Sequence, residues 1–173
     1  MNKTHEQYIP LIVTVGQVVI FPYYIIWLKE ASYSYSLFAW LFALFSFAAA
    51  FGYYMYLKNV TSKSFIISFV YLLMGIVYML VYLTRYSTDN LAYIALLLQL
   101  FLGFLQGYFK GWHSMQTSYR LHVIHHYVIF GIVMIGLSFI KIVSPSIILG
   151  LFGFLLSICG LWLFIKNSLL TTK

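Results

Sequence analysis

Histidines crowd one short stretch of this sequence, between Lys110 and His126, which holds four of the five histidines in the chain. If this stretch is helical, His122, His125 and His126 are spaced i, i+3 and i+4 and lie on one helix face. Imidazole nitrogens on one face can share a metal ion or reach a haem iron, with His113 as a further ligand. A metal- or haem-binding redox protein is therefore one hypothesis for this chain, although the rest of the sequence requires no cofactor.

The same histidines also suit two simpler roles. At a cytoplasmic membrane interface, imidazoles interact well with anionic headgroups, and their titration near neutral pH would let them sense pH or handle protons. The string His122-x-x-His125-His126 resembles one histidine box of the membrane fatty-acid desaturases and hydroxylases. That family needs several such boxes, and only His113 and His5 remain here, which argues against a di-iron site. The interfacial role is favoured.

Three glutamines are the most polar side chains inside long apolar segments. Gln17 lies in the first such segment, whereas Gln99 and Gln106 lie seven residues apart in the fourth and so share a helix face. An amide left without a partner in hydrocarbon is costly, so each must face another helix or a cavity. Packing is the default interpretation, and an intramembrane polar site for a ligand or water is the alternative.

The fourth segment also carries the ridge Gly103-x-x-x-Gly107-x-x-x-Gly111. Small residues at this spacing let another helix approach closely, either within one subunit or between subunits. The third segment carries a stripe of tyrosines that is predicted to pack rather than to stack on a ligand: Tyr71, Tyr78 and Tyr82.

Apolar helices must position all these residues, because the chain is 63% hydrophobic, 8% charged and has a mean hydropathy of +0.94. About 20 apolar residues cross the hydrocarbon core of a bilayer. Six stretches qualify, at residues 9–28, 37–57, 65–83, 91–109, 122–140 and 146–165. The fifth is the weakest, since its first turn holds three histidines. The predicted fold is an all-α membrane protein with six transmembrane helices in a single integral membrane domain, residues 1–173.

The charged residues between these segments predict the orientation. Lys and Arg concentrate in cytoplasmic loops, and an inside N-terminus puts seven on that side and three outside: Lys3, Lys58, Lys63, Lys110, Arg120, Lys166 and Lys173 against Lys29, Arg85 and Lys141. Both termini are therefore predicted to be cytoplasmic. The short outer loops predict three antiparallel hairpins.

The same distribution of charge also predicts which binding partners this chain has. The formal net charge of +7 is dispersed singly between apolar segments, so no patch could neutralise several phosphates, and nucleic acid is not expected as a partner. The expected partners are the lipid bilayer and either other membrane subunits or further copies of this chain.

The C-terminal hairpin resembles a known membrane-protein repeat. The residues that carry the resemblance are Gly131-Ile-Val-Met-Ile-Gly136, Lys141, Pro145, Gly150, Gly153 and Gly160. They are similar to the two-helix repeat of the HdeD-type acid-resistance membrane proteins. The resemblance extends less clearly to the second hairpin and hardly to the first. It implies six spans arranged as three hairpins.

Several common chemistries lack their residues. Glu6, Glu30 and Asp89 all lie outside the predicted spans, which disfavours ion-coupled secondary transport. The sequence contains no Gly-x-Ser-x-Gly, His-Glu-x-x-His or P-loop motif, which favours a non-enzymatic protein. We therefore expect a small multi-pass protein of the bacterial plasma (inner) membrane that acts as a transport or stress-related component or as a subunit of a membrane complex. Besides the redox protein, the substrate-binding subunit of a vitamin importer fits the size and topology, although such subunits usually have longer outer loops.

Overall fold

The computed structural model describes residues 4–32, 34–58, 64–84, 90–115, 128, 131–133, 135–136 and 144–171, and nearly all of these residues are helical. Five long helices make up most of the described chain: α1 (Thr4–Ala31), α2 (Tyr35–Lys58), α3 (Ser64–Leu83), α4 (Leu91–Ser114) and α6 (Pro145–Thr171). Each of them is long and apolar enough to cross a membrane. The described chain is thus all-α, as predicted, and consistent with a multi-pass membrane protein.

The predicted spans and the observed helices agree in place and differ in length. α1 begins before residue 9, and α4 continues beyond residue 109 as far as Ser114. Hydropathy marks only the apolar part of a helix, whereas backbone hydrogen bonds extend it into the polar interface. The fifth predicted span, residues 122–140, lies mostly outside the described residues, which include only 128, 131–133 and 135–136 of it.

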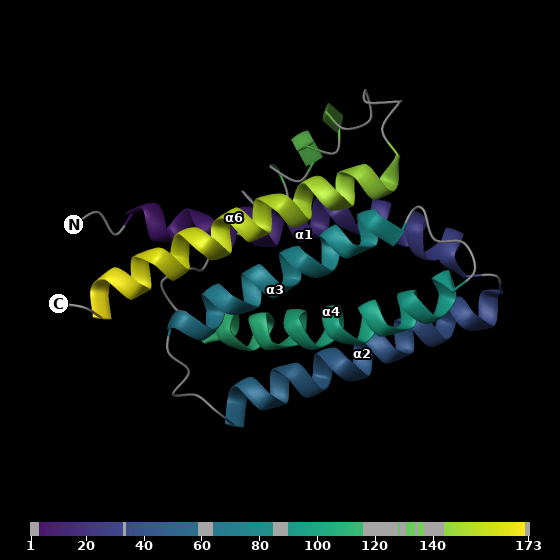
Figure 1. The fold of residues 1–173 in the computed structure, drawn as a ribbon, viewed down its shortest axis with the longest axis horizontal. Coiled ribbons are helices and arrows are strands. Elements are labelled where there is room, and N and C mark those ends of the chain that lie inside the picture. Colours follow the sequence, from purple (N-terminus) through teal and green to yellow (C-terminus); the bar gives the residue numbers. More distant parts are fainter. Residues whose placement is uncertain are drawn as a thin grey trace.

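The helices lie side by side along the long axis of the molecule (Figure 1). Helices α1 to α4 alternate in direction, and both marked termini lie at the same end of the bundle. The end of α4 and the beginning of α6 lie at opposite ends. A chain that alternates in this way is expected of successive membrane crossings.

Two helix pairs make the most extensive contacts, α2 with α4 and α3 with α6. α3 also contacts α4 and so joins the two pairs, while α1 packs on α6 and, to a smaller extent, on α4. α1 and α2 are neighbours in sequence but make no extensive contact in the described chain. Of the three predicted hairpins, α3 and α4 do contact each other, α1 and α2 do not pack extensively, and the third stays a prediction because residues 122–140 lie mostly outside the described chain. The closest approaches are made by faces with small residues and not by helices joined by short loops.

The glycine ridge of α4 lies against α2. A Cβ atom on Gly103 would lie 2.5 Å from the carbonyl oxygen of Phe45, and one on Gly107 would collide with the backbone of Ala49. A Cβ atom on Gly111 would lie 2.9–3.1 Å from the Cβ and ring atoms of Tyr56, also on α2. Backbone therefore packs on backbone along this seam, and the close approach increases dispersion contacts between two helices whose outer faces are apolar.

A second set of small residues joins α3 to α6. A Cβ atom on Gly153 would lie 2.7 Å from the carbonyl oxygen of Gly75, and one on Gly160 would lie 2.8 Å from the backbone nitrogen of Leu72. The amide of Asn167 on α6 donates a hydrogen bond of 3.1 Å to the hydroxyl of Ser68 on α3. This pair is thus held by close backbone packing and by at least one interhelical hydrogen bond.

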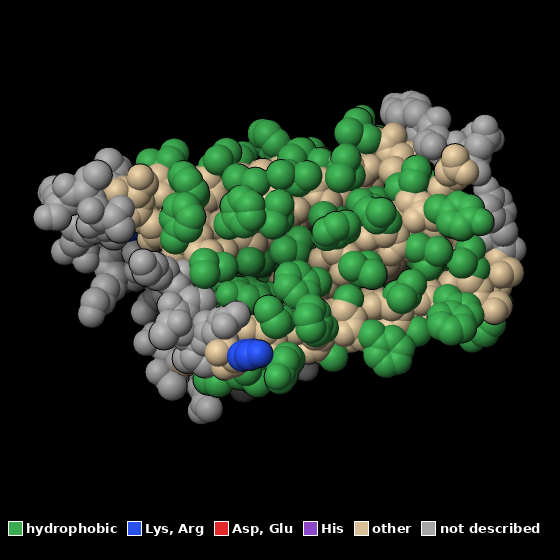
Figure 2. Space-filling model, turned by 60° about the horizontal axis from the view of Figure 1, so that its bottom comes forward, with side chains coloured by type: hydrophobic (Ala, Val, Ile, Leu, Met, Phe, Trp, Pro, Cys, Tyr) green, Lys and Arg blue, Asp and Glu red, His purple; other side chains and the backbone are tan. Residues whose placement is uncertain are grey.

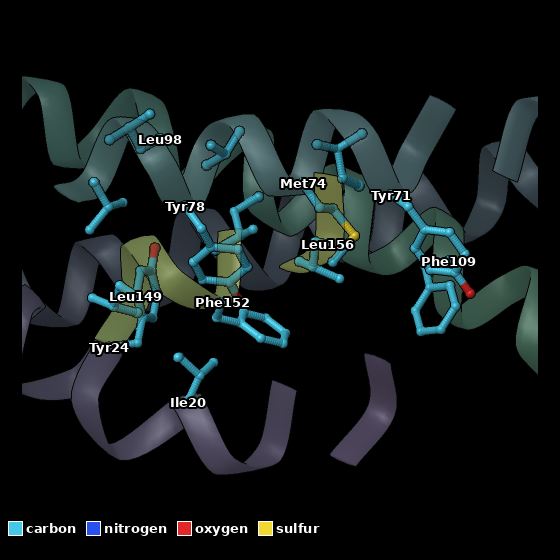
Figure 3. Packing of buried hydrophobic residues seen from close by; sticks show 14 of the residues in the cluster. Ile20, Tyr24, Tyr71, Met74, Tyr78, Leu98, Phe109, Leu149, Phe152 and Leu156 are labelled. Atoms are coloured by element: carbon cyan, nitrogen blue, oxygen red, sulfur yellow. The ribbon is translucent and has the colours of Figure 1, made fainter. Parts of the chain in front are cut away.

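Aromatic side chains fill the centre, where α1, α3 and α6 meet. Figure 3 shows Ile20 and Tyr24 of α1 on the side that faces Tyr78 of α3 and Phe152 of α6. The Tyr24 and Tyr78 rings are 6.0 Å apart and the Tyr78 and Phe152 rings 5.2 Å apart, both edge to face. This geometry is the favoured one for aromatic pairs, so it fixes the position of α1 on the bundle.

The outside of the bundle is apolar. Figure 2 shows hydrophobic side chains over most of one face, with the visible Lys and Arg side chains near one end. Large side chains such as Trp40 and Phe47 of α2 are 62% and 73% exposed. Such an extent of exposed apolar surface is typical of a lipid-facing exterior.

Candidate functional site

A cavity of about 280 Å³ lies between α1, α2, α3 and α4. All three glutamines singled out from the sequence line it, Gln17 from α1 and Gln99 and Gln106 from α4. Tyr24 of α1 and Tyr78 of α3 line it as well. Small-molecule sites usually occupy roughly 300–1,000 Å³, so this cavity suits a small ligand or the head of a larger one.

The polar atoms of the cavity divide into paired and unpaired ones. The amide nitrogen of Gln106 donates a hydrogen bond of 3.1 Å to the hydroxyl oxygen of Tyr78. By contrast, three buried atoms have no hydrogen-bond partner among the described residues: Gln17 Nε2, Gln99 Oε1 and the hydroxyl oxygen of Tyr24. Gln99 is only 1% exposed. A buried polar atom without a partner costs about 1–3 kcal/mol, so these three atoms are suited to a ligand that supplies the missing hydrogen bonds.

The remaining wall is mainly aromatic. Phe21 of α1 and Phe42 and Phe45 of α2 line the cavity opposite the glutamines of α4. Behind Tyr24 lies Trp27, whose ring is stacked on it with centroids 5.6 Å apart. Flat apolar walls with a few unpaired amides are suited to a planar molecule with a polar edge.

One charged side chain, Lys110, belongs to the described lining of the cavity. It lies one helical turn beyond Gln106 on α4 and is exposed. Since Lys110 is in the last part of α4, its flexible stem can carry the ammonium to the membrane interface, as lysines near helix ends commonly do. The positive charge therefore lies at one end of the cavity and not among the unpaired amides.

The sequence pattern predicts the three glutamines as a polar site, but it does not predict the tyrosines that complete this site. Tyr78 was expected only to pack, yet it both packs on Phe152 and accepts the hydrogen bond of Gln106. Tyr24 was missed, although it follows Gln17 by seven residues and so shares its helix face, as Gln99 and Gln106 share theirs. This seven-residue spacing is the sequence pattern from which Tyr24 could have been predicted as part of the site.

The histidine site predicted from the sequence falls mostly beyond the described part of the chain. His113 lies near the end of α4, with its ring centroid 5.9 Å from that of Phe109. His122, His125 and His126 lie outside the described residues. Within the described ranges no group of three or more His, Cys, Asp or Glu residues could hold a metal ion. Metal, haem or pH-sensing roles for these four histidines stay predictions.

Two other pockets are comparable in size but offer less chemistry. One, of about 390 Å³, lies between α3 and α6 beside Tyr82 and Gly150, and its walls are almost wholly apolar. The other, of about 360 Å³, lies beside Lys29, Ser32 and Ser34 at the turn from α1 to α2. The described residues that line these two pockets include no buried polar atom that lacks a partner. The glutamine cavity is therefore the candidate functional site.

No protein-family model, no curated protein and no solved structure matches this chain. Two of the glycines that carry the resemblance to the HdeD-type repeat, Gly153 and Gly160 of α6, pack on α3, whereas no described atom lies within 4 Å of a Cβ position on Gly131 or Gly136. The geometry of the cavity therefore provides the basis for inferring a function.

Proposed function

We propose that this chain is a small non-enzymatic protein of the bacterial plasma membrane that binds a small molecule in the glutamine cavity, as a transport-related component or as a subunit of a membrane complex. The observation that carries this proposal is the pair of buried, unpaired amide atoms on Gln17 and Gln99 in otherwise apolar surroundings. In the same proposal, residues 122–140 form a sixth span and both termini are cytoplasmic.

The behaviour of the other polar residues in the spans supports a role in binding. Thr14 and Ser46 donate hydrogen bonds of 2.8 and 2.9 Å to carbonyl oxygens of their own helices, and Ser157 does the same at 2.9 Å. Gln106 is paired with Tyr78. These four polar side chains are thus satisfied within the protein. Gln99 departs from that pattern, because its amide oxygen has no partner among the described residues. A leucine of similar size would avoid the cost of this unpaired amide.

The chemistry of the cavity favours binding over catalysis. The side chains that surround the unpaired amides are phenylalanines, tyrosines and aliphatic residues, which can hold and orient a molecule. General acid–base or nucleophilic catalysis needs a titratable or nucleophilic group within hydrogen-bond reach of the reacting atom. Among the described lining residues, the groups that could titrate are the hydroxyls of Tyr24 and Tyr78, which are neutral near pH 7, and Lys110, which lies toward the end of α4. Transport or delivery of a bound molecule is therefore the function that this site supports best.

The experiment is the recovery of the bound molecule. The full-length protein is extracted from its native membrane in polymer-bounded nanodiscs, and the small molecules it retains are identified by mass spectrometry. We expect one class of molecule to be enriched with the wild type and to fall at least about tenfold with Gln99→Leu, since losing one hydrogen bond to a buried group has an effect of this size.

Ser46→Ala is the matched control, because Ser46 is also polar, lies in α2 and bonds to its own helix. It is expected to retain the molecule at the wild-type level. Equal retention by wild type and Gln99→Leu, or no enrichment with any variant, would overturn the proposed function.

A further inference from the structure

The glutamine cavity extends to the outer surface of the bundle. Val18 and Phe21 of α1 line the cavity and are also 39% and 51% exposed. Across from them, Phe42 and Phe45 of α2 line the cavity and are partly exposed. α1 and α2 make no extensive contact in the described chain. Between α1 and α2, the rim of the cavity is thus made of apolar side chains, as expected of a surface that faces acyl chains.

The interior of the cavity favours an uncharged ligand. Its deeply buried polar groups are the neutral amide of Gln99 and the neutral hydroxyls of Tyr24 and Tyr78. A charged group placed among them would lose its hydration without gaining a counter-ion. Lys110 lies at the end of α4 and is exposed, so it does not compensate a charge held beside Gln99.

The unpaired atoms also define which hydrogen bonds the ligand makes. Gln17 Nε2 is a donor, Gln99 Oε1 is an acceptor, and the Tyr24 hydroxyl can be either. A ligand that completes this set carries an acceptor oxygen and a hydroxyl- or amide-type donor, and one ring hydroxyl can act as both. The neighbouring aromatic rings of Tyr24, Phe42 and Phe45 favour a flat ring that carries these groups on its edge.

We infer that the cavity binds an uncharged, lipid-soluble molecule with a hydrogen-bonding ring, of the quinone and quinol class, which enters from the bilayer between α1 and α2. This inference rests on the proposed function and names its ligand class. In the quinol form, ring hydroxyls accept hydrogen bonds from Gln17 and Tyr24 and donate one to Gln99. In the quinone form, ring carbonyls accept from Gln17 and Tyr24 and make no hydrogen bond to the Gln99 oxygen. The apolar tail lies along the rim formed by Val18 and Phe21.

A phospholipid accounts for fewer of the observations. Its phosphate would bind Lys110 and its acyl chains would fill the aromatic part of the cavity. Acyl chains offer no hydrogen bonds, so the buried atoms of Gln17, Gln99 and Tyr24 would stay unpaired beside them. The phospholipid is therefore an alternative outcome of the test.

The stacked pair of Tyr24 and Trp27 provides the readout for this test. The full-length protein, in nanodiscs of phosphatidylcholine, is titrated with a benzoquinone that carries a decyl tail, and tryptophan fluorescence is followed. Quinones quench nearby tryptophans, and Trp27 lies 5.6 Å behind the ring that faces the cavity. We expect saturable quenching that is largely lost in Trp27→Phe. The expected affinity of Gln17→Leu is about tenfold weaker, because Gln17 Nε2 donates to a ring carbonyl of the quinone.

Three controls make the result specific. Ser46→Ala is expected to bind as the wild type does, and decylbenzene, which has the ring and tail without carbonyls, is expected not to compete with the quinone. Thermal unfolding of each variant in the same nanodiscs shows that it is folded. Equal quinone affinity in wild type and Gln17→Leu would overturn the ligand class.

Failure of the ligand class is distinguishable from failure of the proposed function. If native nanodiscs retain a different molecule in a manner that depends on Gln99, the function stands and the quinone class is wrong. If they retain an anionic phospholipid that Lys110→Ala releases and Gln99→Leu does not, the cavity is a lipid site and both proposals fail.

Discussion

Gln99 and Gln106 lie on the same face of α4 but have opposite environments. Gln106 donates a hydrogen bond to Tyr78, so its amide is part of the packing between α4 and α3. Gln99 is almost fully buried, and its amide oxygen has no partner among the described residues. The same residue type therefore stabilises the bundle at one position and, in the ligand-free protein, destabilises it at the other.

This contrast gives opposite stability changes for the same substitution. Gln99→Leu removes an unpaired buried group, so it is expected to raise the free energy of unfolding of the ligand-free protein by about 1 kcal/mol or more. Gln106→Leu leaves the Tyr78 hydroxyl without its donor. This substitution is expected to lower the free energy of unfolding by about 0.6 kcal/mol. Reversible unfolding in mixed detergent micelles measures both changes. A loss of stability in Gln99→Leu would contradict the assignment of Gln99 as unpaired.

At the scale of the elements, glycines decide which helices pair. The ridge on α4 brings the backbone of α2 into contact, and Gly75, Gly153 and Gly160 do the same for α3 and α6. α1 lacks an equally close backbone seam, and its Gly16 faces the ring of Phe152. A helix held by side-chain packing can separate from a neighbour more easily than one held by backbone contact. This difference is consistent with movement of α1 to open the proposed entrance between α1 and α2.

The ridge also predicts a graded series of glycine substitutions. Gly107→Ala places a methyl group against the backbone of Ala49 and is expected to lower the free energy of unfolding by about 1–3 kcal/mol. Gly111→Ala meets Cβ and ring atoms of Tyr56 at 2.9–3.1 Å, a smaller overlap than at Gly107, so its effect is expected to be smaller. Gly136→Ala is the control, because no described atom lies within 4 Å of its Cβ position. Unfolding in mixed micelles measures the series, and equal effects at Gly107 and Gly136 would contradict this packing.

At the scale of the whole molecule, the distribution of apolar surface matches a bilayer. The described helices alternate in direction and expose large apolar side chains along their length, while both termini lie at one end (Figures 1 and 2). The excess of Lys and Arg in the segments assigned to that end predicts that it is cytoplasmic. With this orientation, Lys110 lies toward the inner leaflet and the turn after α1 lies outside.

Cysteine labelling tests this orientation. In a Cys159→Ser background, the free thiol of the chain is removed and single cysteines are introduced at exposed positions near opposite ends, Ser34→Cys and Met115→Cys. A membrane-impermeant maleimide is expected to label position 34 in intact cells and position 115 only after permeabilisation. The reverse pattern would show that the N-terminus is outside.

The length and apolar character of the five described helices could be predicted from the sequence, because they are local properties of the chain. The same holds for the glycine ridge and for the need of Gln17, Gln99 and Gln106 to find partners, since spacing and the cost of buried amides are visible in one segment at a time. The tertiary structure decided which helices pair, because that depends on whether faces from distant segments fit together. It also decided that the three glutamines line one cavity with Tyr24 and Tyr78, since a cavity forms only where four helices fail to fill the space between them.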